Sequence, residues 1–218
     1  LAIGMTLVTA SSGGQDISVG ATMAIAGSVI LRMVCGGQVT ADTMQTPLIL
    51  AVLAGVLATM LCGAFNGALV AYFKIQPMVA TLIMYTAGRS IAAWINNNQL
   101  PIINDLGFKY AGTFLPGVPV PTPIFITVLV ILAFWLILKF TTLGLYTQSV
   151  GINANSSRLN GLDPKLIKLL TYVILGVCVA LAGFIRVSRS GSINYSRMAE
   201  NIEMDAILAV ALGGNALS

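Results

Sequence analysis

The sequence predicts an all-α polytopic membrane protein with about five full spans plus two broken or partial helices. Hydrophobic residues make up 57% of its 218 residues, charged residues make up 8%, and the mean hydropathy is +0.92. A soluble domain carries about 25% charged residues, so this chain has too little charge to cover a surface that faces water. Apolar runs near the roughly 20 residues that one crossing needs also recur along the chain. We therefore expect one transmembrane domain over residues 1–218.

The individual helices are expected where apolar runs lie between polar or proline-containing connections. A partial helix is expected first, followed by five full spans, at Leu1–Thr9, Ser18–Cys35, Thr46–Phe73, Met78–Ile95, Pro123–Phe140 and Leu166–Ile185. Pro47 falls in the first turn of its span, where proline is tolerated. The connection 96–121 is longer, and its apolar residues, among them Phe108 and Tyr110, lead us to expect that it lies against the membrane interface.

Two glycine-containing polar interruptions carry most of the functional information. The first covers residues 11–20 and the second covers residues 203–215. Backbone that leaves helical geometry at membrane depth must be buried in protein or line a wet cavity, and transporters place their substrate path at such broken helices. The predicted path residues are polar or glycine residues of these segments and of one span: Gly13, Gly14, Asp16, Ser18, Asn66, Asp205 and Asn215.

Each of these path residues also has a purely structural interpretation. Asp16 and Ser18 suit the N-cap of the helix that follows, and Asp205 suits the first turn of a helix, where the helix dipole favours a carboxylate. Asn66 lies within the small-xxx-small pair of Gly63 and Gly67, which is typical of close helix packing or of a contact with a second subunit. The sequence leaves both interpretations open.

Several classes of site are missing from the sequence. There is no histidine, and the three cysteines, Cys35, Cys62 and Cys178, lack metal-ligand spacing, so we predict no metal, no cofactor and no catalytic residue. The net charge is +4, but the basic residues are scattered singly, which argues against nucleic-acid binding. Gly20 is not followed by the lysine of a phosphate-binding loop, so any nucleotide must bind to another chain.

Residues 141–165 form the longest hydrophilic stretch. Ser156 to Asn160 can form a short helix that Gly161 stops, because glycine after a helix end is a typical C-terminal signal. This helix could be a solvated connector or a docking element for a cytoplasmic partner. Basic residues are only weakly biased toward this side of the membrane, so the positive-inside rule does not settle the orientation.

Several motifs, taken together in order, resemble a known family. They are Gly13-Gly14-Gln15-Asp16-Ile17-Ser18-Val19-Gly20, Lys74-Ile75-Gln76-Pro77-Met78-Val79-Ala80-Thr81-Leu82, Val150-Gly151-Ile152-Asn153, Leu181-Ala182-Gly183 and Asp205-Ala206-Ile207-Leu208-Ala209-Val210 with Gly213-Gly214. The chain resembles the permease subunits of bacterial ABC importers for monosaccharides, in the ribose, xylose and galactofuranose group, and the details are most similar to galactofuranose-type permeases. The resemblance covers essentially the whole chain and implies a fragment of a larger permease, truncated at both ends.

The resemblance implies a function and partners. It implies a permease subunit in the bacterial cytoplasmic (inner) membrane that imports a monosaccharide. Its partners would be a cytoplasmic ATP-binding subunit, a second permease subunit (identical or different) and an extracytoplasmic sugar-binding protein. The ATPase partner would hydrolyse ATP, so this chain would not be an enzyme, and the spans Pro123–Phe140 and Leu166–Ile185 would transmit the motion as packed rods. The alternative is an ion-coupled secondary transporter of a small polar solute, but such proteins usually bury ionisable relays in their spans.

The resemblance also assigns residues to coupling. Residues 141–165 would form a cytoplasmic coupling loop that docks on the ATPase through Asn153, Ser156, Ser157, Arg158, Asn160 and Gly161. Three departures from the family pattern bear on these assignments. Gln15 replaces a usual apolar residue, Ser156-Ser157 replace a usual alanine pair, and Asn215 replaces a usual Thr or Ser. Gln15 and Asn215 leave the identity of the sugar open, and the two serines alter the contact with the ATPase.

Overall fold

The computed structural model describes residues 1–114, 117 and 119–214, and it confirms an all-α membrane protein. The helices and strands are α1 (Ala2–Ser12), α2 (Val19–Val34), β1 (Thr40–Ala41), α3 (Leu48–Ala71), α4 (Pro77–Ile95), β2 (Ile102–Ile103), α5 (Leu106–Tyr110), α6 (Thr122–Phe140), α7 (Leu143–Ile152), α8 (Ala154–Leu159), α9 (Pro164–Ser190) and α10 (Ile202–Leu212). Within the described part, α3, α4, α6 and α9 are long and apolar enough to cross a membrane. One expected span, α2, is a shorter apolar helix of 16 residues.

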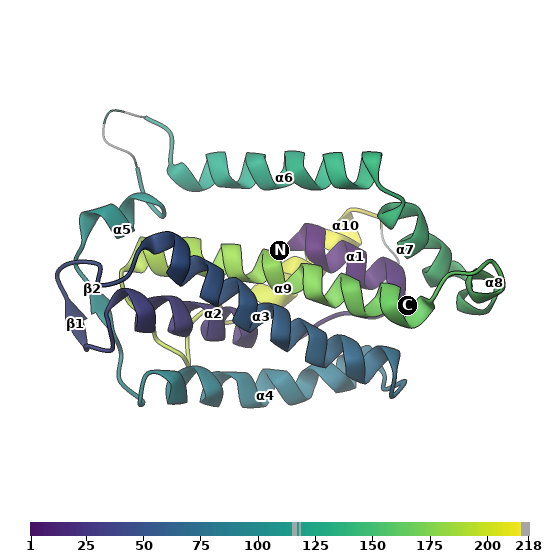
Figure 1. Cartoon of the computed structure of the whole chain (residues 1–218), viewed down its shortest axis with the longest axis horizontal. Helices are drawn as coiled ribbons and strands as arrows, with labels where there is room; N and C mark the ends of the chain where they lie inside the picture. The colour runs from purple at the N-terminus through teal and green to yellow at the C-terminus, as the bar shows by residue number, and fades with distance from the viewer. Residues whose placement is uncertain (115–116, 118, 215–218) are drawn as a thin grey trace.

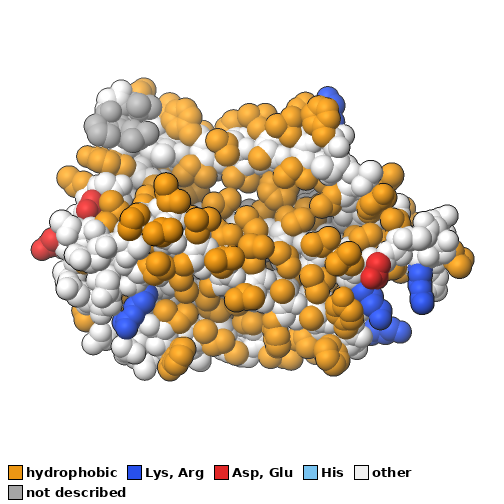
Figure 2. All heavy atoms as spheres, in the orientation of Figure 1, with side chains coloured by type: hydrophobic (Ala, Val, Ile, Leu, Met, Phe, Trp, Pro, Cys, Tyr) orange, Lys and Arg blue, Asp and Glu red, His pale blue; other side chains and the backbone are white. Residues whose placement is uncertain are grey.

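Charge and hydrophobicity are separated along the molecule in the way that a bilayer requires. Hydrophobic side chains cover the middle of the face shown in Figure 2, and charged side chains gather toward the two ends of its long axis. The long helices run along this axis, with α8 at one end and β1, β2 and α5 at the other (Figure 1). The chain is therefore a multi-pass membrane protein whose two polar ends are built from different connections.

Helices α3 and α9 pack closely against each other, and glycines make this contact possible. A side chain at Gly63 would collide with the backbone carbonyl of Tyr172, and a Cβ at Gly176 would lie 2.5 Å from the carbonyl oxygen of Thr59. Without side chains at these positions the two backbones approach closely along their length. The small-xxx-small pair of Gly63 and Gly67 thus serves helix packing within the chain.

Helix α6 differs from the other long helices, because none of its described residues is buried. It runs along one side of the molecule, apart from the α3–α9 pair (Figure 1). The expectation that residues 123–140 act as a rod packed in the bundle is therefore wrong for this structure. The reason is that α6 is apolar all round, which fits contact with lipid or with another protein surface as well as contact with this bundle.

The end of the bundle opposite α8 is formed by three connections that pair with one another. β1 and β2 are parallel, with Thr40 opposite Ile102, and the Ile103 N–H donates to the carbonyl of Gly191 at 2.7 Å. The expected irregular loop over 96–121 therefore contains a strand and the short helix α5. Phe108 of α5 is buried against Phe184 of α9, with ring centroids 6.2 Å apart, so this part of the loop packs on protein.

Candidate functional site

The first interruption separates α1 from α2. Gly13 ends α1 in the left-handed conformation, with φ of 67°, and its N–H donates to the carbonyl of Thr9 at 3.0 Å. A Cβ at Gly14 would lie 2.6 Å from the ring of Pro77, at the start of α4. Both glycines are thus required by geometry, the first by its backbone conformation and the second by the close approach of a neighbouring helix.

A buried polar cluster holds this interruption in place. Oδ1 of Asp16 accepts hydrogen bonds from the backbone N–H and the hydroxyl of Ser18, at 2.7 and 2.6 Å. Nδ2 of Asn66, on α3, donates to the Ser18 hydroxyl at 2.9 Å and to Oδ2 of Asp16 at 3.4 Å. All three side chains are at most 4% exposed. The structure therefore brings together three of the predicted path residues, from two elements, in one hydrogen-bonded group.

The neighbouring backbone is anchored to two further helices. The Ile17 N–H donates to the hydroxyl of Thr81 on α4 at 3.2 Å, and the Asp16 N–H points at the sulfur of Met5 on α1 at 3.5 Å. The non-helical segment is therefore buried in protein on several sides, which is one of the two environments that the bilayer allows for such backbone. The role of Asp16, Ser18 and Asn66 in a substrate path stays a prediction.

The predicted second interruption, residues 203–215, is helical over most of its described length, because α10 covers Ile202–Leu212. The non-helical backbone of this region runs instead over 191–201, just before α10, and the name second interruption is used for it from here on. α10 ends at Gly213 and Gly214, where the sequence predicts a helix end. Asp205 lies in the first turn of α10, as expected, but its side chain is exposed. It does not join the cluster around Asp16, and Asn215 lies outside the described residues.

An arginine that we did not include among the predicted site residues holds this second segment. Nη1 of Arg89, on α4, donates to the carbonyl oxygens of Tyr195, Ser196 and Met198 at 2.8, 2.9 and 3.2 Å. The signal in the sequence was a lone arginine within an apolar span, because such a residue needs a partner inside the membrane protein. What the sequence did not show is that its partners are backbone carbonyls.

Gly20 lies at the junction of the two interruptions. A Cβ there would lie 2.7 Å from the Ala199 carbonyl oxygen and 2.8 Å from Oε2 of Glu203, which is buried and has no hydrogen-bond partner. The start of α2 and the entry to α10 therefore touch directly.

The predicted coupling residues lie on and around α8. The Asn153 side chain caps the helix by accepting from the Ser156 N–H at 3.0 Å, and Gly161 follows it with φ of 82°. Arg158, Ser156 and Asn160 are exposed, as docking would require. Ser157 is only 5% exposed, and its hydroxyl donates to the Asn153 carbonyl, so it stabilises the helix from inside.

Two apolar side chains near α8 were not among the predicted residues. Leu159 is 91% exposed and Ile152 is 87% exposed. Ile152 helps to line a surface cavity of about 480 Å³ between α7 and α8. Hydrophobicity alone could not reveal them, since apolar residues are common throughout this chain. Their exposure at a polar end of the molecule is the informative observation.

Helix α7 lies in a stretch that the sequence predicts to be a polar loop, and it connects α8 to the first interruption. Gly151 near its end lies against the backbone carbonyl of Ala10 on α1, so closely that no side chain fits there. The buried residues of α7 are Thr147 and Val150, which lie one turn apart. Two residues are too few to show a helical periodicity of hydrophobic positions in the sequence. Through this contact α8 is mechanically joined to α1, three residues before Gly13.

Comparison with known proteins agrees with this architecture. Residues 1–218 match the family model described as "Branched-chain amino acid transport system / permease component". Over its whole length the chain is 42% identical to the galactofuranose transporter permease protein YtfT of Escherichia coli (strain K12), of which it covers 61%. It is 36% identical to the ribose import permease protein RbsC of the same strain, covering 66% of it, and 33% identical to the fructose import permease protein FruF of Bifidobacterium longum (strain NCC 2705), covering 59%. The chain thus spans about three fifths of the length of these relatives. No solved structure is significantly similar to it.

Proposed function

Because this chain belongs to the permease-component family of branched-chain amino acid transport systems, we propose that it is a transmembrane permease subunit of an ATP-binding-cassette importer. Its proposed cargo is a monosaccharide, since the relatives are named for galactofuranose, ribose and fructose. The low charge of the described spans suits an uncharged, polyhydroxylated solute better than an ion.

The observation that carries this proposal is the continuous contact from α8 to the first interruption. α8 is short, capped at its start and exposed on the side of Leu159, and α7 holds it against α1 through Gly151. A force applied to α8 by a partner reaches α1 without a flexible link. We propose residues 141–165 as the cytoplasmic coupling loop, and we place the ATP-binding subunit on the exposed face of α8.

The proposed path lies where the two interruptions meet. Movement of α1 would strain the hydrogen bonds of Asp16 and Ser18, and the contact at Gly20 would pass that strain to the entry of α10. Gly13, Gly14 and Asn66 stay proposed path residues on this basis, whereas Asp205 and Asn215 stay proposed path residues from the sequence alone. Alternating access then consists of opening and closing this junction, while affinity for the sugar is supplied by an external binding protein.

The remaining parts of the assembly are proposals of the same kind. A second permease subunit, identical or different, would complete the channel in the bacterial cytoplasmic membrane. ATP hydrolysis would belong to the cytoplasmic subunits and not to this chain.

The experiment compares two variants on the same short helix. The full-length permease is reconstituted in proteoliposomes with its ATP-binding subunit and sugar-binding protein, and sugar uptake is measured together with ATP hydrolysis. Leu159→Asp places a charge on the exposed face of α8, so we expect uptake to fall at least tenfold while thermal stability is unchanged. Ser157→Ala is the control, because Ser157 faces inward and should retain at least half of the uptake.

Equal uptake by the Leu159→Asp and wild-type proteins would exclude α8 as the docking element. Dissipating the proton gradient at constant ATP tests the transport class, and we expect uptake to continue. Strong inhibition would instead favour the ion-coupled secondary transporter.

A further inference from the structure

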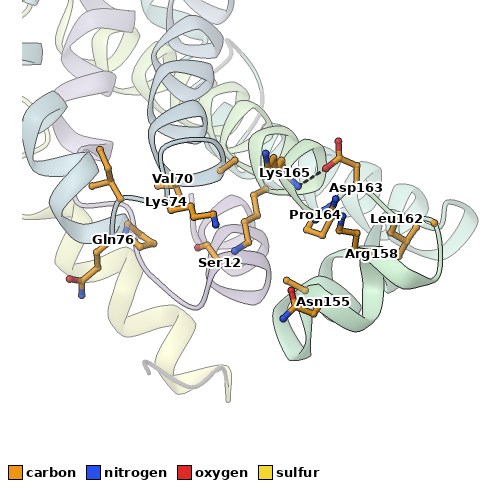
Figure 3. A pocket seen from close by; sticks show the side chains of 16 residues that line it. Ser12, Val70, Lys74, Gln76, Asn155, Arg158, Leu162, Asp163, Pro164 and Lys165 are labelled. Atoms are coloured by element: carbon orange, nitrogen blue, oxygen red, sulfur yellow. Dashed lines mark hydrogen bonds between the residues drawn. The ribbon is translucent and has the colours of Figure 1, made fainter.

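A cavity with strong positive charge lies at the α8 end of the molecule, outside the proposed path. It has a volume of about 800 Å³ and is lined by the ends of α1 and α3, the α3–α4 connection, α8 and the start of α9. Figure 3 shows side chains from these separate elements around one space, with Lys74 and Lys165 on the bundle side and Arg158 on the α8 side. A volume of this size is typical of a small-molecule site.

The charge of the cavity is unbalanced. Its lining includes four cationic side chains, Lys74, Arg158, Lys165 and Lys168, and one acidic side chain, Asp163. That carboxylate is already engaged at the start of α9, because its Oδ1 accepts a hydrogen bond from the Lys165 backbone N–H at 3.0 Å. Lys74, Arg158 and Lys165 are exposed and Lys168 is half-buried. Their like charges around one cavity repel one another, and an anion between them would relieve this repulsion.

The position of the cavity selects the kind of anion. Lys74 follows the end of α3, and Lys165 and Lys168 lie in the first turns of α9, two helices that are long and apolar enough to span the membrane. Phospholipid headgroups lie at this level of a bilayer. Next to the cationic residues along the chain are Phe73, 72% exposed, and Leu166, 50% exposed, which offer apolar surface to an acyl chain. The Lys165 ammonium also lies 5.5 Å from the centre of the Tyr72 ring.

We propose that this cavity binds the phosphate of an anionic phospholipid headgroup and thereby bridges α8 to α3 and α9. Basic pockets between transmembrane helices are suited to such headgroups, because each lysine or arginine near the phosphate adds electrostatic attraction. The bound lipid would restrain α8 relative to the bundle. This effect on coupling rests on the proposed function of α8 as the docking element. Binding itself depends only on the membrane-spanning fold.

The test measures lipid binding to the full-length permease in detergent, without the ATP-binding subunit and without sugar. Phosphatidylglycerol is titrated against the wild-type protein and against the double variant Lys165→Gln/Lys168→Gln, with phosphatidylcholine as the zwitterionic lipid. Affinity for phosphatidylglycerol should fall about 25-fold, or about fivefold for each lysine removed. The matched control is Lys139→Gln, because Lys139 ends α6 and lies over the Trp135 ring at 4.6 Å, away from the cavity lining. Its affinity should change less than twofold.

Four results would overturn the proposal. Equal loss in the Lys139→Gln control would show a general charge effect, and an equal affinity for phosphatidylcholine would show that the anionic headgroup is not recognised. Inorganic phosphate that competes as well as the lipid would identify a site for free phosphate. Normal lipid binding by the double variant, together with loss of the ATP-binding subunit in a separate co-purification of the same variant, would assign the cavity to protein contact.

A folding defect is monitored by the thermal midpoint in phosphatidylcholine alone. If the double variant fails to fold, Lys74→Gln carries the test, because Lys74 is an exposed residue in a connection. Lipid binding can fail while Leu159→Asp still uncouples transport, so this proposal and the proposed function can be rejected independently.

Discussion

The two interruptions share glycine and a carboxylate in sequence, but the structure stabilises them in opposite ways. In the first, the carboxylate of Asp16 is buried and accepts hydrogen bonds from Ser18 and Asn66. In the second, the carboxylate of Asp205 is exposed within α10, and the non-helical backbone before α10 is held by the Arg89 guanidinium through three carbonyl oxygens. The first break is therefore stabilised by an anionic side chain that accepts hydrogen bonds, and the second by a cationic side chain that donates them.

This difference follows from where the free backbone groups are. The start of α2 presents N–H groups, which an oxygen acceptor satisfies, whereas the segment 195–198 presents carbonyls, which only a donor can satisfy. Buried backbone groups must be paired in a membrane protein. Whether the unpaired backbone groups at a break are N–H donors or carbonyl acceptors thus decides which charged side chain can stabilise it.

The largest expected effect is that of Asp16→Ala. The substitution leaves the Ser18 N–H and the Ser18 hydroxyl without their acceptor in a buried site and removes the longer of two hydrogen bonds of the Asn66 amide, at a cost of about 3 kcal/mol. Thermal unfolding of the purified full-length protein in detergent measures this loss. Asp16→Asn is the control, because it keeps one oxygen acceptor and should lose about half as much. An unchanged midpoint in Asp16→Ala would show that the cluster does not hold the first break.

Arg89→Gln should have the next largest effect. A glutamine amide is shorter and uncharged, so it cannot reach all three carbonyls, and we expect a loss of about 2 kcal/mol. Limited proteolysis between residues 191 and 201, followed by mass spectrometry, should show faster cleavage there than in the wild-type protein. Cleavage at the wild-type rate would mean that other contacts hold the second break.

Asp205→Ala should have the smallest effect on stability. The exposed carboxylate contributes only through the dipole of α10, so the expected loss is at most about 0.5 kcal/mol. Uptake measured on the same protein makes the comparison sharper. If Asp205 lines the path, uptake should fall severalfold while stability is unchanged. Uptake at the wild-type level would show that Asp205 only interacts with the helix dipole and does not line the path.

The sequence determined the parts of this protein that depend on one segment at a time. Apolar runs of membrane-spanning length predicted α3, α4, α6 and α9, and the ends of α8 and α10 were predicted by Gly161, Gly213 and Gly214. These features depend on hydropathy and on the conformational preferences of glycine, which act locally.

Only the tertiary structure decided what depends on contacts between segments far apart in the chain. The burial of Asp16 but not Asp205, the contact of Gly151 with α1, the role of Arg89 and the cationic cavity each need residues from several helices. The physical reason is that a hydrogen bond or an electrostatic contact acts over a few ångströms. A one-dimensional pattern does not contain the distances at which such contacts form.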